Sequence, residues 1–191
     1  MKVTHITTDS GNIKEKLLPL LLNNVFHVTS EGAFKKIQKF GFINSNKDST
    51  YPSNFTHKNW GTLNGMVCLI DLRQKTLSEA EEHLSDGYYF LRPKSDWKVV
   101  VFLLLNSAFH EDLKLQARFS PPRIGENYIL MKDVCVGTYV PTECWYPKRI
   151  SLDKISKAIV LEVQSPPPTD DFSLADILRK VFARNEAEKR N

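Results

Sequence analysis

Residues 25–43, VFHVTSEGAFKKIQKFGFI, constrain the fold of this chain more than any other segment. The apolar run 25–28 predicts a short strand that carries one histidine, His27. Ser30 is a favoured N-cap residue, so a helix should begin directly after the strand. Gly41 is placed to end that helix, since glycine is common just beyond a helix C-terminus. The segment therefore predicts a strand that turns directly into a helix, with an imidazole near the corner.

The predicted helix after Ser30 is amphipathic, with a lysine-rich face toward water. Its expected buried face consists of Ala33, Phe34, Ile37 and Phe40. An earlier helix is predicted over residues 12–22, because apolar residues recur there at helical spacing. Ser78 and Glu81 have the spacing of a capping box, which predicts a short helix from residue 78 to residue 84.

Apolar runs elsewhere predict strands, and polar stretches predict long loops. The expected strands cover residues 25–28, 66–72, 88–91, 98–105, 128–136 and 157–163, and the expected loops cover residues 44–65 and 118–127. The 98–105 run is apolar enough to lie in the centre of a sheet. This pattern indicates one α+β domain over residues 1–164. Residues 165–191 are expected to form a Pro-rich linker and a terminal helix that packs on the same domain.

Composition limits the possible function classes. The formal net charge of +4 is compatible with an anionic ligand but too small to indicate a nucleic-acid-binding protein by itself. No apolar run reaches the roughly 18 residues of a membrane-spanning helix, and the first residues lack the apolar core of a signal peptide. We therefore expect a cytoplasmic protein that does not bind membranes. The three cysteines are widely spaced, which argues against a disulfide framework or a metal site.

The pattern H-x-T-S at residues 27–30, followed by Ile37 and G-x-I at residues 41–43, resembles the first signature of the ADP-ribosyltransferase-like superfamily. This resemblance implies a split β-sheet core flanked by helices, and an enzyme that uses NAD. It also implies that His27 holds a ribose hydroxyl, with Thr29 or Ser30 supporting the same sugar. The structural alternative for His27 is a core histidine that is hydrogen-bonded to a backbone carbonyl.

Glu143 lies in the segment VPTECWYPKRISLDKI, residues 140–155. The spacing from Glu143 to Ile155 is similar to that after the catalytic glutamate in DNA-targeting ADP-ribosyltransferase toxins. Departure of nicotinamide leaves oxocarbenium character on the ribose, which a nearby carboxylate stabilises. The resemblance therefore implies that Glu143 is catalytic and shares one cleft with His27. The alternative is an exposed glutamate in a loop between prolines.

The expected central tyrosine of the His-Tyr-Glu class is missing, since its position holds Val67. Tyr51, Tyr88 and Tyr89 are the candidate substitutes for stacking on nicotinamide, and the alternative for each is a packing or rim residue. Arg118 and Arg123 are candidates for binding pyrophosphate, because guanidinium groups suit phosphate oxygens. Arginines together with histidine are also used by the RNA 2′-phosphotransferases of the same superfamily.

The resulting functional expectation is a transferase, of toxin or defence type, that moves ADP-ribose from NAD to a nucleic-acid or protein acceptor. Trp60 and His57, in the 44–65 segment, are expected to contact the acceptor. Two alternatives stay open. One is an RNA 2′-phosphotransferase-like enzyme, and the other is a degenerate module that binds a nucleotide or partner without turnover, which the missing tyrosine encourages.

Overall fold

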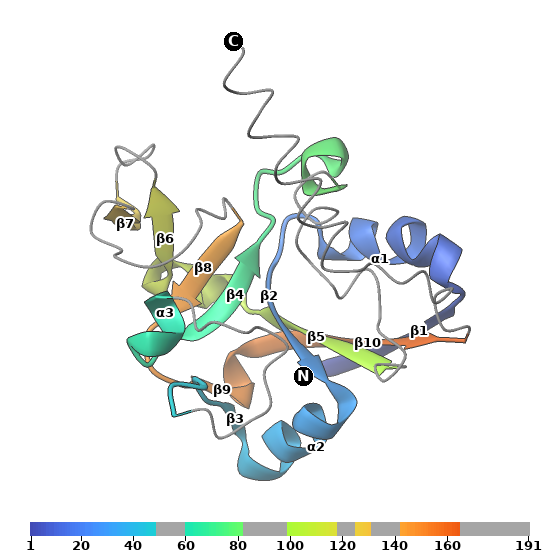
Figure 1. The fold of residues 1–191 in the computed structure, drawn as a ribbon, viewed down its shortest axis with the longest axis horizontal. Coiled ribbons are helices and arrows are strands. Elements are labelled where there is room, and N and C mark those ends of the chain that lie inside the picture. The colour runs from blue at the N-terminus through green and yellow to red at the C-terminus, as the bar shows by residue number, and fades with distance from the viewer. Residues whose placement is uncertain (49–59, 82–98, 118–124, 131–141, 165–191) are drawn as a thin grey trace, which may run out of the picture.

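The fold is built on one large, mostly antiparallel sheet with few helices (Figure 1). The computed structural model describes residues 1–48, 60–81, 99–117, 125–130 and 142–164. Within these ranges, eight strands form the sheet in the order β1-β10-β5-β2-β4-β8-β6-β7, and a separate pair joins β3 to β9. The pairs β1–β10 and β6–β7 are parallel, and the other neighbours in the large sheet are antiparallel. The predicted α+β class is therefore confirmed at this coarse level.

The strands of the large sheet span both ends of the described chain. They are β1 (Lys2–Thr8), β2 (Val25–Ser30), β4 (Val67–Asp71), β5 (Val99–Leu105), β6 (Lys114–Ala117), β7 (Asn127–Leu130), β8 (Glu143–Tyr146) and β10 (Ile155–Val163). The small pair consists of β3 (Phe42–Ile43) and β9 (Ile150–Ser151). The apolar β5 lies between β10 and β2, as its composition predicted.

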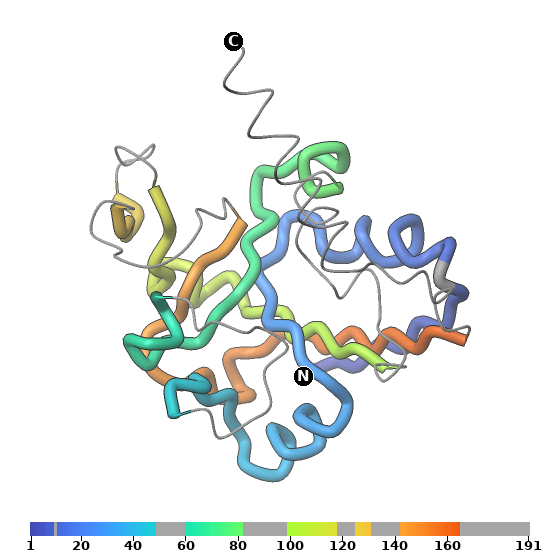
Figure 2. The backbone as a smooth tube through the Cα atoms, viewed as in Figure 1, coloured from blue at the N-terminus to red at the C-terminus, as the bar shows by residue number. Residues whose placement is uncertain are grey.

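Two main helices cover opposite faces of the sheet, as the ribbon and the tube both show (Figures 1 and 2). They are α1 (Ile13–Leu21) and α2 (Glu31–Phe40), and a single turn, α3 (Trp60–Leu63), precedes β4. Short 3-10 helices occupy Ser10–Asn12, Ser107–Asp112 and Leu152–Lys154. No helix in the described ranges is both long enough and apolar enough to cross a membrane.

Each face of the sheet has its own hydrophobic core. On the α1 side, Leu17, Leu21, Phe26, Phe102 and Ile159 are fully buried together. On the α2 side, the core contains Val25, Phe34, Leu69, Leu103 and Ile150. Strands β2, β4 and β5 supply alternate residues to both cores, because neighbouring side chains on a strand point to opposite faces.

The predicted helix at residues 31–40 has the expected ends. The Oγ atom of Ser30 accepts a hydrogen bond from the Ala33 N–H at 3.3 Å. Gly41 has a φ of 82°, and its N–H bonds to the Ile37 carbonyl. The expected burial of Phe40 is wrong, since its side chain is 56% exposed. Phe40 is the last residue of α2, where the chain turns away at the left-handed Gly41.

The predicted capping box at Ser78 is displaced by two residues. The Thr76 Oγ1 accepts from the Glu79 N–H at 3.2 Å, and the Glu79 carboxylate accepts from the Thr76 N–H at 2.8 Å. Glu81 instead forms an ion pair with Lys14 of α1 at 3.1 Å. The 44–65 loop was also predicted too long, because α3 occupies Trp60–Leu63. The expected strand at residues 88–91 and the segment 165–191 lie outside the described residues.

Candidate functional site

The large sheet opens between β2 and β4 (Figures 1 and 2). These strands pair at only two positions, Val25 with Asp71 and Phe26 with Ile70, whereas β2 pairs with β5 over five positions. The opening begins at His27, the next residue along β2. Its Nδ1–H donates a 2.9 Å hydrogen bond to the Cys68 carbonyl of β4. The His27 ring therefore bridges the two strands at the point where they separate.

The backbone of Val28 faces this opening. The Asp71 N–H bonds to the Thr142 carbonyl beside β8, so the backbone groups of Asp71 face β8. Backbone groups of successive residues in a strand point alternately to its two neighbours. The N–H and C=O of Cys68, three residues before Asp71, therefore face β2. If the β2–β4 ladder continued, Cys68 would pair with Val28, but the Cys68 carbonyl accepts the hydrogen bond from the His27 ring instead. Among the described residues, the structure gives the N–H and C=O of Val28 no backbone partner on the β4 side. One donor and one acceptor thus lie side by side at the opening.

The environment of His27 keeps its ring neutral. Burial lowers the pKa of His27, although the hydrogen bond to the Cys68 carbonyl opposes this shift. A carbonyl can only accept, so Nδ1 carries the proton and the neutral ring presents Nε2 as an acceptor. Thr29 is buried and lies on the same face of β2 as His27. The Ser30 hydroxyl is the N-cap of α2 and is only half-buried.

Glu143 begins β8, which lies beside β4 on the side away from β2. Its carboxylate is half-buried, and burial raises its pKa. The indole Nε1–H of Trp145 donates to Glu143 Oε1 at 2.8 Å, which lowers the pKa and partly offsets that rise. The alternative of an exposed loop glutamate is therefore wrong, since Glu143 is a strand residue with a defined partner.

His27 and Glu143 do not point to one face of the sheet. Phe26, Ile70 and Glu143 form one row of cross-strand partners, and such partners share a face. His27 follows Phe26 in β2, so its side chain leaves the strand on the opposite face. The expectation that both side chains face one cleft is not met. The sequence could not reveal this, because a shift of one residue in register reverses the face of every side chain.

Cys68 connects the surroundings of these two residues. Its carbonyl accepts the His27 hydrogen bond, and its cross-strand partner on β8 is Trp145, which holds Glu143. Its Sγ lies 3.1 Å from the Thr62 Oγ1 of α3. The candidate site therefore consists of two groups on opposite sides of β4, with Cys68 between them.

Trp60, the predicted acceptor-contacting residue, belongs to the Glu143 group. Its ring lies 5.2 Å from the Trp145 ring, centroid to centroid, at an interplanar angle of 52°. Gly61 packs directly on the same indole, and a Cβ atom there would be 2.0 Å from Trp145 Cδ1. Since Trp60 is only half-buried, part of its surface is available to another molecule.

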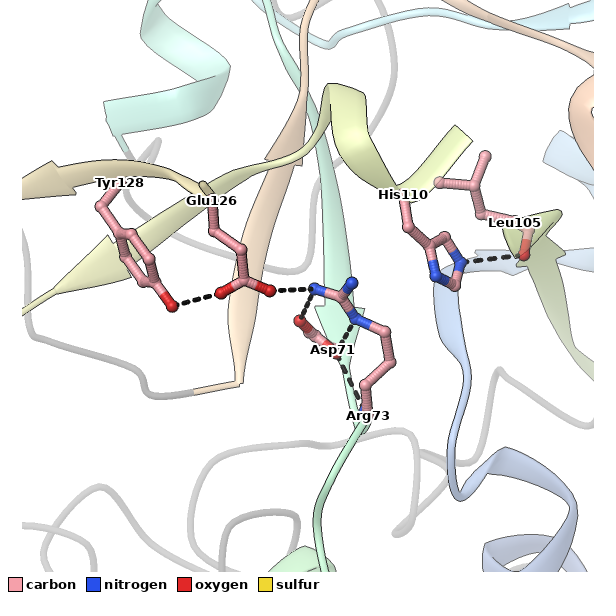
Figure 3. A network of polar contacts seen from close by, with 6 residues as sticks. All are labelled: Asp71, Arg73, Leu105, His110, Glu126 and Tyr128. Atoms are coloured by element: carbon pink, nitrogen blue, oxygen red, sulfur yellow. Dashed lines mark hydrogen bonds and ion pairs between the residues drawn. The ribbon is translucent and has the colours of Figure 1, made fainter. Parts of the chain in front are cut away.

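A separate polar network lies around the C-terminal end of β4 (Figure 3). Arg73 makes two side-chain bonds to Asp71, at 2.7 and 3.0 Å, and lies 3.9 Å from Glu126. Tyr128 of β7 donates to Glu126, and His110 bonds to a carbonyl at the end of β5. Two carboxylates oppose one guanidinium, so the network does not favour an anion. It links β4 to the segment that carries β7.

Several predicted site residues lie outside the described ranges: Tyr51, His57, Tyr88, Tyr89, Arg118 and Arg123. Val67, which stands at the expected tyrosine position, is a buried residue of β4. In the described part of the chain, no group of three or more His, Cys, Asp or Glu side chains could hold a metal ion.

Sequence reasoning missed Trp145, Gly61 and the backbone of Val28. Trp145 stands two positions after Glu143, and the alternation of side chains in a strand was the signal that could have paired them. Gly61 and Val28 carried no such signal, because their roles depend on the packing of α3 and on where two strands separate. Comparison of the chain with protein-family models, curated proteins and solved structures found no match.

Proposed function

We propose that this protein binds NAD in the opening between β2 and β4. The observation that carries the proposal is the pair of backbone groups on Val28, which face the opening beside the His27 ring. The carboxamide of nicotinamide has one C=O acceptor and one N–H donor side by side. It is thus complementary to the donor and acceptor of a single extended residue. Binding there would satisfy both groups at once.

His27 suits the sugar that follows nicotinamide. Its Nδ1–H is held by the Cys68 carbonyl, so the ring is fixed in one orientation with Nε2 as an acceptor. A ribose hydroxyl is a matching donor. Thr29 and Ser30 are the last residues of β2, just before α2, and the resemblance to the ADP-ribosyltransferase-like superfamily assigns support of the same ribose to one or the other. This proposal places the ligand at the corner that the sequence pattern indicated.

ADP-ribosyl transfer is the second candidate function, and the environment of Glu143 favours it. The carboxylate is half-buried, is held by an indole N–H and lies on the second strand from His27. Such a carboxylate suits stabilisation of an oxocarbenium-like ribose. The opposite directions of the His27 and Glu143 side chains favour binding without turnover instead. The RNA 2′-phosphotransferase alternative depends on Arg118 and Arg123 and stays a prediction.

Calorimetric titration with NAD tests the binding proposal. In His27→Asn, the Asn Nδ2 can still donate to the Cys68 carbonyl, but the ring nitrogen that would meet the ribose is gone. We expect NAD affinity to fall about tenfold or more while the fold is retained, as for loss of one hydrogen bond in a polar site. His5→Asn is the matched control, since His5 also lies in a His-x-Thr tripeptide but on the edge strand β1. Equal affinity in the wild type, His27→Asn and His5→Asn would contradict the proposal.

Incubation with labelled NAD and mixed nucleic-acid and protein acceptors tests turnover. Glu143→Gln keeps the size of the side chain and removes its charge, so transfer should be lost while NAD binding is largely retained. Wild-type transfer in Glu143→Gln would show that the carboxylate has no catalytic role. NAD binding by the wild type without transfer to any acceptor would favour the binding module.

A further inference from the structure

The strongest unassigned feature of the Glu143 group is the tryptophan that holds it. Trp145 is 1% exposed, and its polar Nε1–H faces the carboxylate of Glu143 at 2.8 Å. A buried indole N–H normally has a partner, and here the partner is an ionisable side chain. Both residues lie on β8 and share one face of the strand, so the backbone itself sets their spacing.

The position of the Trp145 ring is fixed by α3. Trp60 packs against it, and Gly61 approaches so closely that any Cβ would overlap three of its ring atoms, at 2.0, 2.2 and 2.5 Å. The φ of Gly61 is not in the left-handed region, so this close approach is what requires a glycine. The side chain of Glu has three rotatable bonds, and a fixed donor reduces the freedom of its carboxylate. The α3 turn thus acts on Glu143 through Trp145.

We propose that Trp145 is a positioning residue that orients the Glu143 carboxylate, and that Trp60 and Gly61 hold the Trp145 ring for this task. The inference rests on the proposed catalytic role of Glu143 and deepens it. It assigns a second task to Trp60, which is the first residue of α3 and is expected to contact the acceptor. An acceptor that packs on Trp60 would touch a residue only one ring away from the indole that holds the carboxylate.

Trp145→Phe tests the proposal by removing the N–H while keeping an aromatic ring. The ionised carboxylate loses a donor, so the pKa of Glu143 should rise, as measured from its side-chain carbon resonance by NMR. Turnover should fall about ten- to a hundredfold, as for the loss of a hydrogen bond to a charged group, with little change in the KM for NAD. The acid limb of the rate profile should move to higher pH.

Tyr146→Phe is the matched control. Tyr146 is the next residue of β8, faces the opposite side of the sheet and donates to Asp112 at 2.6 Å. This variant also loses one polar group from a buried aromatic, but it should leave the pKa of Glu143 unchanged. An equal shift in both variants, or none in Trp145→Phe, would overturn the proposal.

A wild-type measurement guards against a variant that does not fold. The Nε1–H resonance of Trp145 should shift with pH as Glu143 titrates, and Glu143→Gln should abolish that step. A resonance without the step in the folded wild type overturns the proposal. The step itself, measured without NAD, supports the contact even if NAD binding and transfer are both absent, which would separate failure of the proposed function from failure of this inference.

Discussion

His27 carries out two tasks with two different atoms. Nδ1 bonds to the Cys68 carbonyl and joins β2 to β4, and Nε2 is the atom proposed to meet a ligand. A substitution can therefore separate stability from binding. His27→Asn keeps a donor near the Nδ1 position, whereas His27→Phe leaves the Cys68 carbonyl without its donor.

We expect His27→Phe to lower the free energy of unfolding by about 1–3 kcal/mol, the cost of a buried carbonyl without its donor. His27→Asn should lose clearly less, although both variants lose the ring nitrogens. Urea denaturation followed by circular dichroism measures both. Equal losses in the two variants would show that the ring volume, and not the bond to Cys68, joins the strands.

Stability should decrease in mild acid because of the same residue. Burial lowers the pKa of His27, and burial also lowers the pKa of His110. Unfolded histidine titrates near 6.5, so below that pH the unfolded chain binds more protons than the folded chain. Stability is then fully present above about pH 6.5 and falls as the pH decreases toward the folded-state pKa values.

Urea midpoints at pH 7.5, 6.5 and 5.5 measure this effect. His27→Asn and His110→Asn should each weaken the dependence relative to the wild type, and the double variant should weaken it most. All variants have the same carboxylates, so the difference between their plots of urea midpoint against pH reports the contribution of the histidines alone. A double variant with the wild-type slope would contradict the prediction.

At the scale of elements, α2 was predictable because its signals are local. Ser30 supplies the N-terminal cap and Gly41 the left-handed residue, and neither depends on the rest of the molecule. Residues 77–81 are also helical, and the start of this segment shows the limit of such signals. Thr76 with Glu79 and Ser78 with Glu81 both have the spacing of a capping box. The first pair forms the box, because the Glu81 carboxylate is paired with Lys14 of α1 instead. Strand β1 was missed because its alternate residues are exposed on an edge, which weakens the apolar pattern.

The two glycines near the ends of α2 should respond oppositely to alanine. Gly41 has a φ of 82°, so Gly41→Ala should lower the free energy of unfolding by about 1 kcal/mol. A Cβ on Gly32 would meet no atom within 4 Å, and alanine favours the helix, so Gly32→Ala should add roughly 0.5 kcal/mol. Chemical denaturation of the pair measures the difference. Two changes of the same sign would contradict the assigned ends of the helix.

The whole molecule has two cores that share one sheet. Because β2, β4 and β5 supply residues to both cores, a substitution that destabilises one core should also destabilise the other. Leu17 of α1 is fully buried, so Leu17→Ala should lower the free energy of unfolding by about 2–5 kcal/mol. Amide exchange should accelerate equally at Leu103 and Phe102, whose side chains face different cores.

Leu20→Ala is the control for this prediction, since Leu20 lies in the same helix but is 37% exposed. Leu20→Ala should change the free energy of unfolding and the amide exchange rates only slightly. Faster exchange confined to α1 in Leu17→Ala would show that the two cores unfold independently.

The sequence predicted the class of this fold but not its arrangement. The apolar runs identified β4, β5 and β10 as strands, since burial on both faces leaves a continuous apolar pattern. The order of the strands, the early separation of β2 from β4 and the opposite faces of His27 and Glu143 all follow from register. Register depends on which strands meet, and no local pattern encodes that.

The pairing of β1 with β10 has a consequence for the synthesis of the protein. Lys2 pairs with Lys157 and Thr8 with Val163, so β1, the earliest of the described strands to be synthesised, pairs with β10, the latest of them. Since β10 also lies between β1 and β5, a nascent chain that ends before Ile155 lacks the strand that joins both. Pairing over such a sequence separation is slow, because the long loop must close first. The sheet is therefore completed only after residue 163 is available, and until then β1 and β5 are exposed edges that a chaperone could bind.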